Sequence, residues 1–227
     1  MPCLERIPLD LIHEKVIKQL HLNKNKDALS IVKELLEIAE SLIQLKVFFK
    51  VSYISKKGED IVEIDGQTFS SRVLRKNLDD VERVFPYIIT IGKALEDKAC
   101  SFDDLLKQYC LENIGDMALH SAKQYLVKHL QKQFGLEKLS SMSPGSLQDW
   151  PVTEQRPLFS LIGNTEDQIG VRLTDYMLMI PRKSISGILF PTEVTFFSCQ
   201  LCPRERCPAR KALYDENLKK EYGLADE

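Results

Sequence analysis

The sequence predicts an α+β fold in which helices flank an antiparallel sheet. Three observations favour this class. Residues 29–43 carry an apolar stripe of helical period, which predicts a helix with one buried face. Residues 45–54 and 61–64 are rich in β-branched and aromatic side chains and flank a polar turn, as in a β-hairpin. A long helical pattern follows over residues 101–134.

The remaining elements before residue 82 are shorter. Apolar residues at helical spacing predict a first helix over residues 8–20. Residues 65–66 are Asp-Gly, which is a turn signal. Ser70 or Ser71 is a suitable N-cap for a short helix through Leu78.

The middle of the chain is expected to hold one strand and two helices. Residues 84–91 predict a strand that ends at Gly92, and residues 93–100 predict a short helix. The long helix should stop at Gly135 and would measure about 45 Å at 1.5 Å per residue. Gly115, in its interior, is either a break or a point of close packing against a neighbour.

Residues 139–190 combine a turn, a helix and two strands. Ser-Pro-Gly-Ser at residues 143–146 is a turn by composition. Thr153 is a suitable N-cap for a short helix with an apolar face. Residues 171–180 predict a strand, and residues 187–190 predict a second, shorter one.

The domain organisation follows from these elements. We divide the chain into an N-terminal helical and hairpin portion (residues 1–82), a central region (83–198) and a cysteine-containing segment with a C-terminal helix (199–227). Because no linker rich in proline, glycine or serine separates the first portion from the rest, the whole chain could equally form one compact domain.

Bulk composition excludes several classes of protein. The formal net charge of −2 argues against nucleic-acid binding, which needs a basic surface. No apolar run approaches the length that spans a bilayer, and the first residues lack the apolar core of a signal peptide. A cytoplasmic location is therefore expected. Six cysteines in such a protein are more readily thiols or metal ligands than disulfides.

Several short motifs within residues 139–190 occur in a characteristic order. They are Pro144-Gly145, Thr153-Glu154, Leu173-Thr174, Met179, Pro181 and Ser184-x-Ser186-Gly187. In this ordered set the chain resembles the activation domain of cobalamin-dependent methionine synthase. The resemblance covers roughly the second half of the chain.

The resemblance implies a function in methionine biosynthesis. Domains of this family bind S-adenosylmethionine and use it to remethylate cobalamin after one-electron reduction. By resemblance, Pro144, Gly145 and Ser146 line the S-adenosylmethionine groove, and the Ser184, Ser186 and Gly187 segment closes it. The cobalamin would be carried by a partner, either a corrinoid-binding protein or a methionine synthase module, because the chain has no D-x-H-x-x-G segment.

Two polar residues are additional candidates for this groove. Asp149 is the one carboxylate in the central turn, and it either holds an amino group of a ligand or accepts backbone hydrogen bonds. Gln124 shares one helix face with Asp116 and His120, close to where the family has an acidic ligand-binding residue. A solvated polar stripe is the other interpretation of that face. Trp150 either stacks on a ligand or packs before the following helix.

The chain departs from the family pattern at two positions. The family has an arginine shortly before Pro-Gly and a tyrosine directly after it, where this chain has Ser141 and Ser146. An arginine presents a planar fork that matches a carboxylate, and a tyrosine presents an aromatic face. Neither serine supplies these groups.

A second chemical feature is the spacing Cys199-x₂-Cys202-x₄-Cys207. A C-x₂-C turn can present two sulfurs to one metal ion, so the three cysteines are candidate ligands of zinc or an iron–sulfur cluster. Three thiolates are one short of a closed site. The fourth ligand could be Cys3, Cys100, Cys110, a histidine or a partner group; alternatively the cysteines are unligated thiols.

Two functional hypotheses therefore follow from the sequence. In the first, the chain binds S-adenosylmethionine and supports reductive remethylation of cobalamin on its partner. In the second, it is a non-catalytic accessory protein whose metal site docks on, or delivers electrons to, a corrinoid protein. The sequence holds none of the common nucleotide-binding or hydrolase motifs, so whether the chain is itself a methyltransferase stays open.

Overall fold

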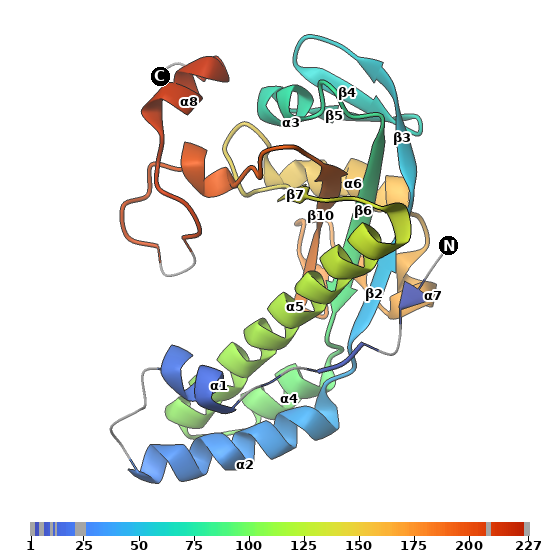
Figure 1. Ribbon diagram of the computed structural model, residues 1–227. Helices are drawn as coiled ribbons and strands as arrows, with labels where there is room; N and C mark the ends of the chain where they lie inside the picture. The colour runs from blue at the N-terminus through green and yellow to red at the C-terminus, as the bar shows by residue number, and fades with distance from the viewer. Residues whose placement is uncertain are drawn as a thin grey trace. The chain divides into compact units, whose positions relative to one another are not determined.

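The computed structural model describes residues 3–4, 7–9, 11, 13–20, 26–207 and 210–224 (Figure 1). They fall into two compact units, each made of three chain segments. Unit 1 comprises Met1–Phe48, Ile88–Lys128 and Asn164–Ile185, and unit 2 comprises Phe49–Tyr87, His129–Gly163 and Ser186–Glu227. The three-part division by sequence stays a prediction.

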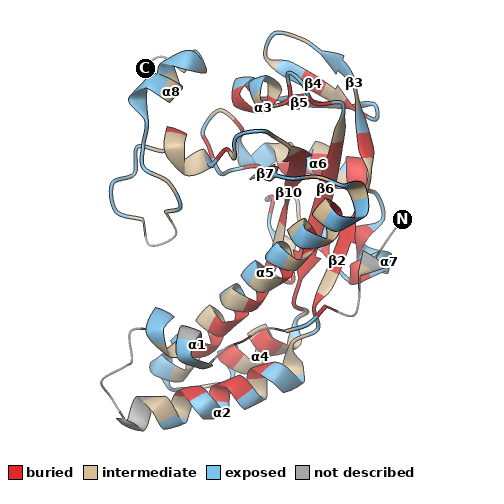
Figure 2. Cartoon of the chain, in the orientation of Figure 1, coloured by how far each residue is buried: buried red, intermediate tan, exposed pale blue. Residues whose placement is uncertain are grey.

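Unit 1 is mainly helical. Its elements are β1 (Cys3–Leu4), α1 (His13–Gln19), α2 (Lys26–Leu42), β2 (Lys46–Phe49, to Phe48), the end of β6 (Arg83–Thr90), α4 (Ala94–Cys100), most of α5 (Leu105–Phe134), α7 (Thr165–Ile169), β8 (Arg172–Leu173) and β9 (Met179–Ile180). Strand β1 pairs antiparallel with β2, and β8 pairs antiparallel with β9. The predicted helix over residues 29–43 is confirmed as α2, whose apolar stripe is buried (Figure 2).

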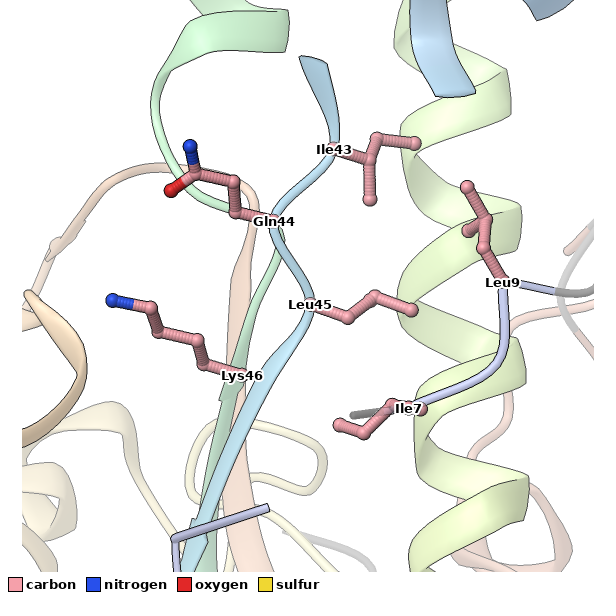
Figure 3. Close-up of a pocket in the computed structure, with 6 residues that line it drawn as sticks. All are labelled: Ile7, Leu9, Ile43, Gln44, Leu45 and Lys46. Carbon is pink, nitrogen blue, oxygen red and sulfur yellow. The ribbon is translucent and has the colours of Figure 1, made fainter. Parts of the chain in front are cut away.

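The first helix is shorter than the sequence predicts. Helix α1 begins at His13, and residues 7–9 and 11 are not helical; residues 10 and 12 lie outside the described part of the chain. Ile7 and Leu9 instead line a pocket together with residues 43–46 (Figure 3). In that view Ile43 and Leu45 point toward Leu9 and Ile7, whereas the polar side chains of residues 44 and 46 point away. Residues 7–9 bury these apolar side chains without forming a helix, and this burial competes with helix formation before His13.

Helix α5 continues without a break at Gly115. A Cβ atom at this position would come within 3.0 Å of Leu95 Cδ2 and 3.1 Å of Ile91 Cδ1, so the glycine allows close packing. The helix begins at Leu105, later than predicted, because Asp104 Oδ1 accepts a hydrogen bond from the Leu106 amide at 2.8 Å.

Unit 2 contains most of the sheet. Its elements are β3 (Ser52–Lys57), β4 (Ile61–Ile64), β5 (Gln67–Ser70), α3 (Arg72–Asn77), the first part of β6, the end of α5, β7 (Leu139–Met142), η1 (Val152–Glu154), α6 (Gln155–Ile162), most of β10 (Ser184–Pro191), η2 (Ser198–Leu201) and α8 (Glu216–Glu221). Strand β6 pairs with β3 and β10, and β10 pairs with β7. The pairs β3–β4, β3–β6, β4–β5 and β7–β10 are antiparallel, which confirms the predicted α+β class.

The hairpin region contains more strands than the sequence predicts. The predicted strand over residues 45–54 is two strands, β2 and β3, and residues 50–51 separate them. There the Lys50 ammonium forms an ion pair with the Asp65 carboxylate at 3.1 Å. Because Asp65 is distant in sequence, the residues around Lys50 give no sign of this contact. The predicted β3–β4 hairpin is confirmed, and β5 is a third strand that was missed. Asp65 and Gly66 have φ of 45° and 82°, as in the two-residue turn that joins β4 to β5.

Several predicted boundaries in the second half were wrong. Residues 171–180 form only the short strands β8 and β9 around a turn, in which the Thr174 amide donates to the Leu178 carbonyl at 2.9 Å. The strand predicted at 187–190 is the longer β10. Thr153 does not cap a helix, because a 3₁₀ turn, η1, precedes α6. The C-terminal helix expected within residues 199–227 is α8, which begins at Glu216 after the N-cap Asp215. No described helix is long and apolar enough to cross a membrane.

Candidate functional site

The Pro-Gly turn, residues 143–150, is folded on itself by backbone hydrogen bonds. The Gly145 amide donates to the Trp150 carbonyl at 2.7 Å, and the Ser146 amide donates to the Ser143 carbonyl at 3.1 Å. Gly145 has φ of 82°, a left-handed conformation that residues with a Cβ atom rarely adopt. Pro144 is buried, whereas Gly145 and Ser146 are exposed. The turn thus presents two small residues on a buried base.

Trp150 anchors this turn in the core of unit 2. Its side chain is fully buried, and its ring meets that of Phe69 edge-on, with centroids 6.3 Å apart. An indole in this position packs against strand β5 and has no face free for a bound ligand. Of the two interpretations of Trp150, the structure favours the packing one.

Asp149 caps helix α3. Its carboxylate accepts hydrogen bonds from the Val73 amide at 2.9 Å, the Arg72 amide at 3.3 Å and the Ser71 hydroxyl. Ser71 is the predicted N-cap, since its hydroxyl accepts from the Leu74 amide at 2.9 Å. Of the two sequence interpretations of Asp149, the acceptor of backbone hydrogen bonds fits this geometry.

The family arginine is replaced by a serine that already has a partner. Ser141 lies on β7, and its hydroxyl is 3.2 Å from the hydroxyl of Tyr87 on β6. Tyr87 is fully buried. The sequence indicated the missing arginine but not this tyrosine, which reads only as one aromatic residue within a strand.

Gly187 of the Ser-x-Ser-Gly motif lies against the start of the Pro-Gly turn. A Cβ atom on Gly187 would come within 2.5 Å of the Met142 carbonyl oxygen and 2.7 Å of Ser143 Oγ. Only glycine fits where β10 pairs with the end of β7. The structure therefore brings Gly187 next to the residues that precede Pro144 and Gly145.

The other predicted groove residues have local partners. Ser184 is buried, and its hydroxyl donates to the Pro181 carbonyl at 2.8 Å and lies 2.9 Å from Thr90 Oγ1. Ser186 is buried on β10. Gln124 is exposed on α5, where its Nε2 lies 3.0 Å from His120 Nε2. Ser184 and Gln124 belong to unit 1, and the remaining candidates belong to unit 2.

The cysteine segment, residues 199–207, is organised around Arg210. The Arg210 guanidinium donates to the carbonyls of Cys199 and Cys202, each at 3.1 Å, and also to those of Arg204 and Ala212. All three cysteines of the segment are partly exposed thiols. Within the described residues no group of three histidine, cysteine or acidic side chains could hold a metal ion.

The residue before the cysteine segment contacts the Pro-Gly turn. Ser198, the first residue of η2, has its hydroxyl 3.3 Å from the hydroxyl of Ser146. Arg210 was missed at the sequence level, because an arginine three residues after the last cysteine carries no pattern that distinguishes it from a surface arginine.

Comparison with known proteins points to one kind of domain. Residues 144–211 match the family described as vitamin B12 dependent methionine synthase, activation domain. The matched region begins at Pro144 and includes the three cysteines of the segment. Comparison with curated proteins gives no match.

The fold is similar to that of a solved structure of the MetH reactivation domain bound to AdoHcy. That structure has a TM-score of 0.60 and 16% identical residues, and the alignment covers 88% of this chain and 81% of that one. The chain thus has the fold of the methionine synthase reactivation domain, as the sequence resemblance predicted.

Proposed function

We propose that the chain binds S-adenosylmethionine at the Pro-Gly turn and supports reductive remethylation of cobalamin carried by a partner, a corrinoid-binding protein or a methionine synthase module. The observation that carries this proposal is the activation-domain match, which starts at Pro144, on a fold shared with a domain bound to AdoHcy. A cytoplasmic location is consistent with the proposal and stays a prediction.

The local geometry offers a surface for part of such a ligand. Gly145 has no side chain and Ser146 has a small one, and both are exposed beside the buried Pro144. Gly187 is buried against the adjoining residues 142–143, where the absence of a side chain lets β10 support the turn. Backbone without side chains lets a ligand approach closely, and the Ser146 hydroxyl can donate or accept a hydrogen bond.

The carboxylate of the ligand lacks the partner that the family pattern supplies. Ser141 provides a hydroxyl in place of the guanidinium, and that hydroxyl is 3.2 Å from the Tyr87 hydroxyl. A neutral hydrogen bond is worth roughly half a charge-assisted one. We therefore expect a dissociation constant in the micromolar range, which corresponds to a binding free energy of about −8 kcal/mol. We also expect the chain to discriminate little between S-adenosylmethionine and analogues that lack its amino-acid end.

The chain's contribution to the chemistry would be positioning. When bound, the sulfonium of S-adenosylmethionine supplies a methyl group that a reduced cobalamin can accept. Residues 143–146 would hold the adenosyl part in one orientation, and a turn fixed by two internal hydrogen bonds loses little entropy in doing so. No side chain of the turn needs to exchange a proton for this role.

Calorimetric titration of S-adenosylmethionine, with AdoHcy as a second probe, tests the proposal. Gly145→Ala should weaken binding at least ten-fold, because its Cβ would lie 3.3 Å from Val152 Cβ and strain the turn. Gly66→Ala is the matched control, since Gly66 has the same φ of 82° and nothing within 4 Å of a Cβ atom. Absence of binding heat in the wild-type chain, or equal losses in both variants, would contradict the proposal.

The second hypothesis, an accessory protein with a zinc or iron–sulfur site, rests on the spacing of Cys199, Cys202 and Cys207 alone. Metal analysis of protein purified without oxygen tests it. Stoichiometric zinc or iron that is lost in Cys202→Ser would support it, and metal-free protein that still binds S-adenosylmethionine would sink it.

A further inference from the structure

Cys199 and Cys202 stand at the two ends of a single 3₁₀ turn. Helix η2 spans Ser198–Leu201, and the Cys202 amide donates to the Cys199 carbonyl at 3.3 Å. Residues joined by such an i to i+3 bond have Cα atoms closer than about 7 Å. A disulfide needs Cα atoms roughly 4.4–6.8 Å apart, so the turn holds the two residues within bridging reach.

Both thiols are accessible to reagents in solution. Cys199 and Cys202 are partly exposed and unbridged. Cys110 provides a contrast within the same chain, because it is buried and its burial, with a smaller effect of Asp104, raises the pKa of its thiol. Accessible thiols exchange with disulfides, and buried thiols in apolar surroundings are inert.

The surroundings of Cys199 differ from those of Cys202. The Lys211 amide points at Cys199 Sγ, with 3.5 Å between nitrogen and sulfur. The cationic Arg210 binds the carbonyls of both cysteines and lies next to Lys211 in the chain. Thiol–disulfide exchange needs one attacking and one resolving sulfur. The Lys211 amide thus distinguishes the sulfur of Cys199, the expected attacking thiol, from that of Cys202, the expected resolving thiol.

We propose that Cys199 and Cys202 form a dithiol–disulfide site that reacts with low-molecular-weight disulfides of the glutathione type. The Cys199 thiolate attacks one sulfur of the disulfide, and a mixed disulfide forms as the other sulfur leaves as a thiolate and takes up a proton. Cys202 loses its proton and attacks the Cys199 sulfur, which expels the second small thiolate. In the balance, the two cysteines are oxidised to one disulfide and one small disulfide is reduced to two thiols.

Cys207 stands apart from this pair. It lies five residues beyond Cys202, outside η2, and its carbonyl accepts a hydrogen bond from the Arg210 amide at 3.2 Å. Its exposure is in the same class as that of the other two thiols. Cys207→Ser is therefore a matched control that removes one accessible thiol without removing a member of the turn.

The test uses the reduced full chain, prepared without oxygen and exposed to glutathione disulfide, with mass spectrometry of intact protein and peptides. The wild type and Cys207→Ser should both form an internal disulfide that links residues 199 and 202. Cys202→Ser should accumulate glutathione on Cys199, and Cys199→Ser should react at least ten-fold more slowly at residue 202.

Two outcomes would overturn the proposal. One is a wild type in which the disulfide joins Cys207 to either of the other cysteines. The other is reduced protein that retains one zinc or iron site per chain and protects all three thiols from reaction. Neither outcome depends on S-adenosylmethionine binding, so the thiol site and the methyl-donor site are tested separately.

Discussion

The Pro-Gly turn and the cysteine segment lie in the same unit and inside the same family match, yet they are held in different ways. The Pro-Gly turn is closed by backbone hydrogen bonds and rests on the fully buried Trp150. In and beside the cysteine segment, the guanidinium of Arg210 donates hydrogen bonds to four backbone carbonyls. We conclude that the turn is part of the core of unit 2, whereas the segment, in which Leu201 is buried but residues 203–206 are exposed, is anchored less firmly and should open more readily.

The largest expected effect comes from Trp150→Ala. Removal of a fully buried aromatic side chain costs about 3–5 kcal/mol of unfolding free energy. Leu213→Ala, at an 85% exposed position just beyond the cysteine segment, should stay within about 0.5 kcal/mol. Urea unfolding curves measure both. Similar midpoints for the two variants would contradict the conclusion that the turn is anchored in the core.

Arg210→Ala should act locally. Loss of charge-assisted hydrogen bonds costs about 1.5–3 kcal/mol. We expect this loss to appear as local opening of the segment and not as a loss of global stability. Limited proteolysis should cut within residues 199–212 at least ten-fold faster, while the urea midpoint changes little. Lys211→Ala is the control, since that residue contributes its backbone amide to Cys199. Cleavage rates equal to wild type would show that Arg210 does not hold the segment.

Asp149→Ala and Asp215→Ala compare the same interaction in the two regions. Each aspartate caps a helix, α3 and α8 respectively, and loss of a cap costs about 0.5–2 kcal/mol. The cost should lie at the upper end for Asp149, because Val73 and Leu74 of α3 are buried, whereas no described residue of α8 is buried. Thermal denaturation measures both values.

Asp149→Ala also bears on the ligand groove. If Asp149 only caps α3, the affinity for S-adenosylmethionine should change less than three-fold under conditions in which the variant is folded. A loss of ten-fold or more, at full folding, would return Asp149 to the set of ligand-binding residues.

The smallest expected effect is that of Ser146→Ala on the cysteine segment. The hydroxyls of Ser146 and Ser198 are 3.3 Å apart on an exposed surface, and such a contact contributes about 0.5 kcal/mol or less. The rate at which Cys199 and Cys202 form a disulfide should therefore change less than two-fold, as measured by the loss of free thiols. A larger change would mean that the two regions are coupled.

Elements with a strong local pattern were predictable from the sequence. The apolar stripe of α2, the β3–β4 hairpin and the Ser71 cap were confirmed, because periodicity, turn residues and capping residues act within a few positions. The stretch around the Pro-Gly turn was also found from ordered motifs. The end of α5 at Phe134 was also predicted, and the helix is unbroken because Gly115 packs closely, although it begins later than predicted.

Features that depend on distant residues could not be predicted. The Ser141 hydroxyl has Tyr87 as its partner, and the Asp149 carboxylate has the start of α3; both pairs are more than fifty residues apart. The cysteine spacing predicted a metal site, but the folded segment places a guanidinium among its carbonyls. A spacing motif reports which side chains are near in sequence and carries no information on how the backbone between them is held.

The most direct test of the central claim is amide hydrogen exchange of the full chain with and without saturating S-adenosylmethionine. The proposal predicts slower exchange in peptides that cover residues 143–150, with unchanged exchange in peptides from α8. Unchanged exchange in residues 143–150, under conditions in which calorimetry detects binding, would contradict the proposal and place the ligand elsewhere.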